Sequence, residues 1–76
     1  MTKITWQGDD DEVKAEYNGM NLVVQKAGRL SCWYWDVTRP MKGINQRKMI
    51  SYGQHRGDIK TAILLCELVA RAEVNK

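Results

Sequence analysis

The sequence has no long hydrophobic run. Its longest strictly apolar stretch, residues 62–66, is far shorter than the roughly 20 residues that a membrane-spanning helix needs. The N-terminal segment, residues 1–6, has no apolar region of the kind found in secretory signal peptides and leads directly into acidic residues. We therefore expect a cytoplasmic protein that does not enter a membrane.

Residues suited to metal binding or nucleophilic catalysis are also few. The chain has one histidine, His55, and two cysteines, Cys32 and Cys66, whereas a structural zinc site needs four ligands in short clusters. The sequence indicates no paired carboxylates in a pocket, no phosphate-binding glycine loop and no nucleophile–base spacing. We therefore expect no enzymatic activity, no catalytic residues, no metal and no cofactor. The cysteines are expected to be free thiols, since unpaired cysteine behaves as a small hydrophobic residue, and a disulfide would require an oxidising compartment.

What the chain does contain is the composition of one small globular domain. It has 76 residues and 8.8 kDa, of which 43% are hydrophobic and 28% are charged, with a net charge of +3. We treat residues 1–76 as one domain. A domain of this size buries only about 60% of the surface that its unfolded chain exposes, so its stability margin is small.

The hydrophobic pattern predicts an α+β fold, in which a three- to four-stranded antiparallel β-meander packs against one long C-terminal helix. Alternating polarity predicts strands at residues 12–17, 20–26, 30–37 and 48–52, and Asn18-Gly19 is a strong hairpin turn. Residues 7–12 read as an acidic loop and residues 38–47 as a basic loop, with Gly53 ending the fourth strand. A helix is expected at about residues 58–74, with Gly57 as its N-cap.

The same periodicities predict which side chains are buried. In the third strand, Trp33, Trp35 and Val37 share one face, and Cys32, Tyr34 and Asp36 share the other. Helical spacing places one apolar stripe against the tryptophan face of the sheet. That stripe consists of Ile59, Ala62, Ile63, Cys66, Val69 and Ala70.

The helix has more apolar residues than this one contact needs. Outside the stripe it carries a second set, namely Leu64, Leu65, Leu68 and Ala72. A helix that lies on one sheet needs a single apolar face, so this second set predicts a contact with a partner protein or a homodimer through the helix. The alternative is that residues 4–6 or the 38–47 loop fold over these leucines.

Charge is separated along the chain. Residues 38–60 hold one acid, Asp58, and six cations, namely Arg39, Lys42, Arg47, Lys48, Arg56 and Lys60, whereas residues 1–17 hold two lysines and five acids. The cations are candidates for contact with nucleic acid or with an acidic protein surface. The outer sheet face offers a weaker candidate for single-stranded nucleic acid, in which Tyr34 lies with Lys14, Glu16 and, after a register shift, Tyr17.

Residues 28–73 have the cadence Gly-x-x-x-x-Trp-x-Trp-x-Val, a loop, a short strand, Gly53 and a helix ending Ala-x-Ala-Glu. This cadence resembles short β-meander-plus-helix proteins encoded by bacteriophages and prophages. The resemblance implies a binder or inhibitor of host machinery, such as an anti-CRISPR protein, in the cytoplasm of the host cell. It assigns no catalytic or binding residue.

The element order is also similar to the arm-binding domain of phage integrases and to the plant ethylene-response DNA-binding domain. In both, a three-stranded sheet enters the major groove. That resemblance implies DNA contacts from residues of the strands and turns, namely Arg29, Arg39, Lys42, Arg47 and Lys48. The chain departs from those domains because its strand faces lack repeated Arg and Lys, and because Asp36 would point at phosphate.

These observations favour a small non-enzymatic binding protein that docks on a host macromolecule and blocks it. The extra leucines would anchor the contact and the basic region would steer it. The alternative is a DNA-binding accessory protein that uses the sheet and the 39–60 basic region.

Overall fold

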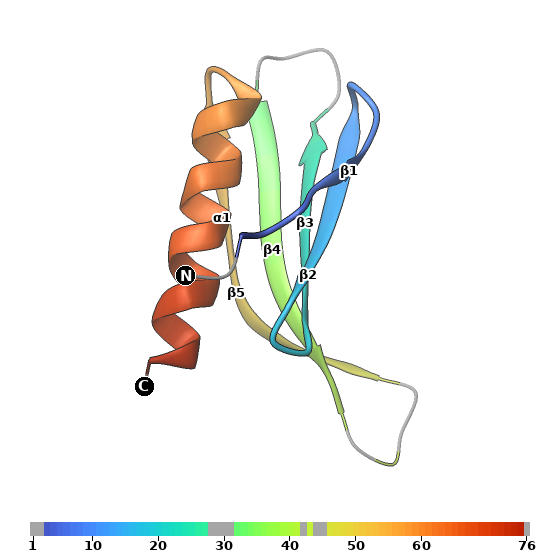
Figure 1. The fold of residues 1–76 in the computed structure, drawn as a ribbon. Coiled ribbons are helices and arrows are strands. Elements are labelled where there is room, and N and C mark those ends of the chain that lie inside the picture. Colours follow the sequence, from blue (N-terminus) through green and yellow to red (C-terminus); the bar gives the residue numbers. More distant parts are fainter. Residues whose placement is uncertain (1–2, 28–31, 42, 44–45, 76) are drawn as a thin grey trace.

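The structure, a computed structural model, describes residues 3–27, 32–41, 43 and 46–75. It is an antiparallel five-stranded sheet with one C-terminal helix, and each strand pairs with the next along the chain (Figure 1). The elements are β1 (Gln7–Gly8), β2 (Glu12–Tyr17), β3 (Met20–Lys26), β4 (Cys32–Pro40), β5 (Arg47–Arg56) and α1 (Ile59–Val74). The predicted α+β class, meander and C-terminal helix are confirmed. No helix in this described part of the chain is long and apolar enough to cross a membrane.

The sheet has one strand more than the three to four predicted. The additional strand, β1, lies inside the stretch predicted as an acidic loop, where Gln7 pairs with Lys14 and Gly8 pairs with Val13. Gly8 adopts φ +149°, and a Cβ at this position would meet the carbonyl oxygen of Glu12. The short strand therefore depends on a glycine, which a polarity pattern reads only as a loop residue.

Strands β4 and β5 are longer than predicted. β4 continues to Pro40 and β5 begins at Arg47, so most of the described part of the predicted 38–47 loop is strand. Gly53 does not end β5 but lies in its interior, directly opposite Trp35. The pairing shifts register between Val37 and Thr38, and such an irregularity bends and twists a strand pair.

The helix begins one residue later than the sequence suggested. Asp58, rather than Gly57, is the N-cap, with extended backbone angles of φ −92° and ψ 154°. Its carboxylate accepts a hydrogen bond of 2.7 Å from the hydroxyl of Thr61. That hydrogen bond is the largest of the contributions that lower the pKa of Asp58.

The core lies between α1 and one face of the sheet. Three small side chains of α1, Ala62, Cys66 and Ala70, are fully buried at four-residue spacing, so the helix axis can approach the strands closely. They pack against buried residues of the sheet, namely Met20, Leu22, Val24, Trp33, Trp35 and Val37. The predicted core stripe of the helix and the predicted tryptophan face are thus confirmed. Cys32 is also buried, as a free thiol like Cys66.

The N-terminal segment covers part of the helix. It runs from beside α1 to β1 (Figure 1), and Ile4 is buried in the core. The indole nitrogen Nε1 of Trp6 donates a hydrogen bond of 2.7 Å to Oε2 of Glu67 on α1. The segment therefore covers the Glu67 side of the helix but leaves Leu64 and Leu68 exposed.

This contact gives a testable prediction. Trp6→Phe keeps an aromatic ring but removes the donor to Glu67, and should lower the free energy of unfolding by about 1.5–3 kcal/mol, the usual contribution of a hydrogen bond to a charged group. Urea unfolding followed by circular dichroism measures the loss. Thr5→Ala, at an exposed neighbouring position, is the control, and an unchanged urea midpoint in Trp6→Phe would show that the segment is held by Ile4 alone.

Candidate functional site

The outer surface of α1 carries the first candidate site. Leu64 and Leu68, which we call the leucine ridge, are 58% and 63% exposed and lie one turn apart on the same row of the helix. Ala72 continues this row and is exposed. Leu65 was predicted to belong to the same surface, but it is partly buried and packs against the core. The structure therefore brings three of the four predicted helix residues together.

Two cations flank the leucine ridge. Lys60 lies one turn before Leu64 and is exposed, and Arg71 lies three residues after Leu68. Arg71 is held in place from two sides: its guanidinium is 5.5 Å from the centre of the Tyr17 ring, and Nη2 is 4.0 Å from Oε1 of Glu67. The acid nearest to the ridge, Glu67, accepts from Trp6. The ridge is therefore a short apolar strip with the exposed Lys60 at one end and the Arg71–Glu67 ion pair at the other.

The predicted basic region does not form a single patch. Arg39, Arg47 and Lys48 lie at one end of the β4–β5 pair, and Arg56 and Lys60 lie at the other end. A strand with the length of β5 extends about 30 Å between those ends. Lys42, like Arg29 from the DNA-binding resemblance, falls outside the described residues. Sequence proximity therefore overstated how closely the cations gather, because an extended strand separates them.

The first group of cations lies on a two-stranded projection, which we call the β4–β5 arm (described residues 39–41 and 46–48). Thr38 is the last residue of β4 that pairs with β3, where its partner is Asn21, so beyond this point β4 and β5 pair only with each other. Figure 1 shows the arm extending past the turn between β2 and β3. All described residues of the arm are exposed.

The sheet face opposite α1 is open. Tyr34 is 46% exposed there, and Tyr52, which pairs with Asp36, is 75% exposed. Tyr17, considered for this face, instead lies on the helix side below Arg71, because β2 and β3 pair without a register shift. The sequence analysis did not place Tyr52 on this face, because it ended the strand at residue 52. In a strand that continues past this point, Gly53 faces the helix opposite Trp35, and Tyr52 therefore faces the open side.

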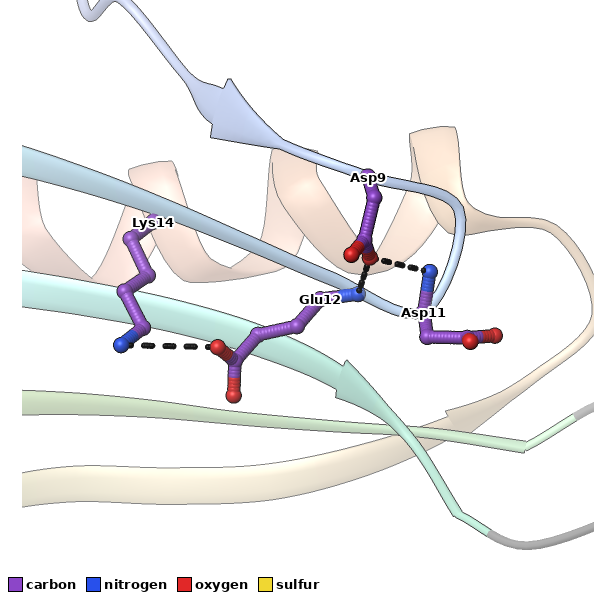
Figure 2. Close-up of polar contacts among 4 residues, drawn as sticks. All are labelled: Asp9, Asp11, Glu12 and Lys14. Atoms are coloured by element: carbon purple, nitrogen blue, oxygen red, sulfur yellow. Dashed lines mark hydrogen bonds and ion pairs between the residues drawn. The ribbon is translucent and has the colours of Figure 1, made fainter.

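The charges on this open face are mixed. Lys14 forms an ion pair with Glu12, 3.4 Å from Nζ to Oε1 (Figure 2), and Asp36 lies in the shallow groove that Lys14 and Arg47 also line. Partial burial, and secondarily the charge of Glu12, raises the pKa of Asp36. Acids therefore lie among the cations of this face, which is unfavourable for phosphate binding.

The acidic stretch at the beginning of the sheet is organised as a turn. Oδ1 of Asp9 accepts hydrogen bonds from the backbone N–H groups of Asp11, at 2.9 Å, and Glu12, at 3.0 Å (Figure 2). These hydrogen bonds lower the pKa of Asp9. The carboxylates of this turn are solvated, and the described residues contain no group of three His, Cys, Asp or Glu side chains arranged to hold a metal ion.

Cys32 pairs with Arg56 and His55 pairs with Trp33, so the side chains of Cys32 and His55 point to opposite faces of the sheet. Cys66 Sγ lies 3.6 Å from the backbone oxygen of Asp36, to which it donates, and Cys32 is buried in β4. His55 Nε2 is 3.9 Å from Oδ1 of Asp58 at the start of α1. The contacts of Cys66 and His55 are those of side chains that support the fold.

Comparisons with protein-family models, with curated protein sequences and with solved structures find no match to this chain. The assignment of a function therefore depends on the surfaces described above.

Proposed function

We propose that this protein is a small non-enzymatic binding protein that docks on a partner protein through the leucine ridge and blocks the surface that it covers. The observation that carries the proposal is that Leu64 and Leu68 remain 58% and 63% exposed although Trp6 contacts the neighbouring Glu67. Apolar anchors four residues apart on one helix face suit insertion of that face into a groove of another protein.

Charge complementarity indicates the kind of groove. Lys60 is exposed at one end of the ridge, so an apolar groove with an acidic rim at that end would meet both the leucines and this cation. Burial of one exposed leucine contributes about 1.5–3 kcal/mol. Burial of the two leucines can therefore hold the partner protein on the ridge. Attraction between the acidic rim and the cation orients the two proteins and increases their association rate.

A second copy of this chain is a poorer occupant of the same surface. In an antiparallel contact centred on the ridge, Lys60 of each copy lies beside Arg71 of the other, and in a parallel contact Lys60 faces Lys60. Like charges at these positions oppose association. We therefore expect the purified protein to be a monomer.

The resemblance to phage-encoded proteins supports a bacterial source for the partner. On that basis the partner would be a host protein, and the chain would inhibit it by covering a functional surface. Anti-CRISPR activity is one instance of such blocking.

The test is capture from nuclease-treated bacterial lysate with the tagged protein and with Leu64→Glu and Leu68→Glu. The parent should capture one protein in stoichiometric amounts, and each variant should capture at least tenfold less of it. Burial of a leucine contributes about 1.5–3 kcal/mol to binding, and the new carboxylate would face an acidic rim. Both positions are exposed, so circular dichroism and thermal unfolding should match those of the parent.

Val74→Glu is the matched control, since it makes the same substitution at an exposed apolar position on α1 that lies off the ridge. It should retain the captured protein. Retention by both leucine variants would contradict the proposal, and so would a dimer in sedimentation velocity that Leu68→Glu dissociates.

A further inference from the structure

We infer that the β4–β5 arm is a second binding site and that its ligand is duplex nucleic acid. This goes beyond the proposed docking through the leucine ridge, because the arm is formed by the sheet and the ridge is formed by the helix. The pairing of β4 with β5 fixes the positions of the arm's cations, so they are in place whether or not a protein is bound to the ridge.

The first argument is the distribution of charge on the arm. Arg39, Arg47 and Lys48 are exposed, and the sequence from residue 37 to residue 57 contains no Asp or Glu. The ion pairs found among residues 3–27, 32–41, 43 and 46–75 involve none of these three cations. The Arg47 guanidinium contacts the side-chain amide of Asn21, whose oxygen accepts when it is turned toward the arginine. Arg47 also lines the shallow groove that contains Asp36, so Arg39 and Lys48 are the cations of the arm farther from an acid.

The second argument is that the cations lie on both faces of the ribbon. Residues paired across two strands point to the same side. Arg39 pairs with Lys48, and Pro40 pairs with Arg47, so Arg39 and Lys48 share one face while Arg47 lies on the other. A flat acidic protein surface touches only one face of such a ribbon, whereas a groove with phosphates along both walls contacts both.

The two-stranded form of the arm agrees with this ligand. The major groove of B-form DNA is about 12 Å wide and admits a two-stranded β-ribbon. Met41 and Met49 are 41% and 50% exposed at the arm and at its base, and apolar side chains of this kind contact thymine methyl groups or base steps once a ribbon is in a groove. The two exposed tyrosines that would stack single-stranded bases, Tyr34 and Tyr52, lie farther along the sheet.

The experiment measures binding of the full chain to a fluorescently labelled duplex of about 20 base pairs by anisotropy, from about 50 to 200 mM salt. Three phosphate contacts predict a slope of log K against log salt of about −3. Arg47→Ala should reduce this slope by about one, and the double variant Arg39→Ala/Lys48→Ala should reduce it by about two, with at least a tenfold loss of affinity at low salt.

The control removes the same net charge from the opposite end of the sheet. Arg56→Ala/Lys26→Ala should leave the slope and the affinity within about twofold of the parent, since both cations are exposed at the end of the sheet that lies roughly 25 Å from the arm along β5. An equal loss of affinity in both double variants would show that binding depends only on net charge, and would overturn the inference. Tighter binding to the labelled single strand, or no binding at about 50 mM salt, would also overturn it.

Leu68→Glu separates this inference from the proposed function. Leu68→Glu should bind the duplex with the same slope of log K against log salt as the parent. Conversely, Arg39→Ala/Lys48→Ala should still capture the protein partner from nuclease-treated lysate. Loss of duplex binding in Leu68→Glu with a normal thermal unfolding curve would place the nucleic acid on the helix, against the inference.

Discussion

Gly53→Ala is expected to lower the free energy of unfolding by about 1–3 kcal/mol, the cost of forcing an extra methyl group into a packed core. A Cβ at residue 53 would lie 2.6 Å from Cζ2 and 2.8 Å from Cε2 of Trp35. These distances are far below van der Waals contact, so either the indole or the strand must move. For a domain of this size the loss is a large part of the total stability.

The indole has little room to move. Trp35 is 9% exposed and lies on the helix side of the sheet, directly across from Gly53. Trp33 is held by a hydrogen bond of 3.2 Å from its Nε1 to the backbone oxygen of Gly57, whereas Nε1 of Trp35 has no protein partner among the described residues. Packing alone therefore fixes the Trp35 ring, and the ring fills the space that a side chain at residue 53 would occupy.

Thermal and urea unfolding of Gly53→Ala and Gly53→Val measure this effect, which should be larger for valine. Gln54→Ala changes the next residue of β5 on the open face and is the control. The combination Trp35→Leu/Gly53→Ala should lose less stability than the sum of the single variants, since leucine leaves space for the methyl group. Simple additivity would show that the two positions do not compete for the same volume.

The second large effect is a loss of stability in alkali that depends on Cys66. The thiol is fully buried on the sheet side of α1. Burial, reinforced by the charges of Asp36 and Glu67, raises the pKa of Cys66 from its ordinary value of 9.0 to about 12. The thiol therefore keeps its proton in the folded state at a pH at which the unfolded chain releases it.

The sign of the effect follows from this difference in proton binding. Below about pH 9 both states hold the proton and Cys66 contributes no pH dependence. Between about pH 9 and about pH 12 only the folded state holds it, so this group increases the unfolding constant by up to tenfold for each pH unit. Stability is thus lost as the pH rises, and it returns when the pH is lowered.

Cys66→Ser isolates the contribution of this thiol. Serine retains a donor for the backbone oxygen of Asp36 but does not ionise in this range. Urea unfolding at about pH 7 and about pH 10 should show the parent losing roughly tenfold more in its folding constant than the variant. The ionisation of lysine and tyrosine is common to both proteins and cancels in the comparison. Parallel losses would show that the folded thiol ionises near its ordinary pKa.

The amino-acid sequence by itself determined those features that depend on neighbouring residues. Alternation gave the bounds of β2 and β3, Asn18-Gly19 gave the turn between them, and helical spacing gave the buried stripe of α1. These patterns are reliable because a side chain's direction within one strand or helix follows from the backbone geometry alone. The same local geometry identified Leu64 and Leu68 as outward-facing residues of the helix.

Only the tertiary structure decided the features that depend on a partner distant in sequence. The length of a strand depends on the strand beside it, so β4 and β5 continue past the predicted loop and form the arm. Gly53 looks like a strand end until Trp35 is placed opposite it. Residues 4–6 carry no sign in the sequence that Trp6 will reach Glu67, 61 positions away.

The distribution of the cations was decided in the same way. Six basic residues that are close in the sequence were expected to act together, but an extended strand carries Arg47 and Arg56 to opposite ends of the sheet. Pairing across β4 and β5 then brings Arg39 beside Lys48. Composition specifies how many charges the chain has, whereas the fold specifies which of them a single ligand can reach.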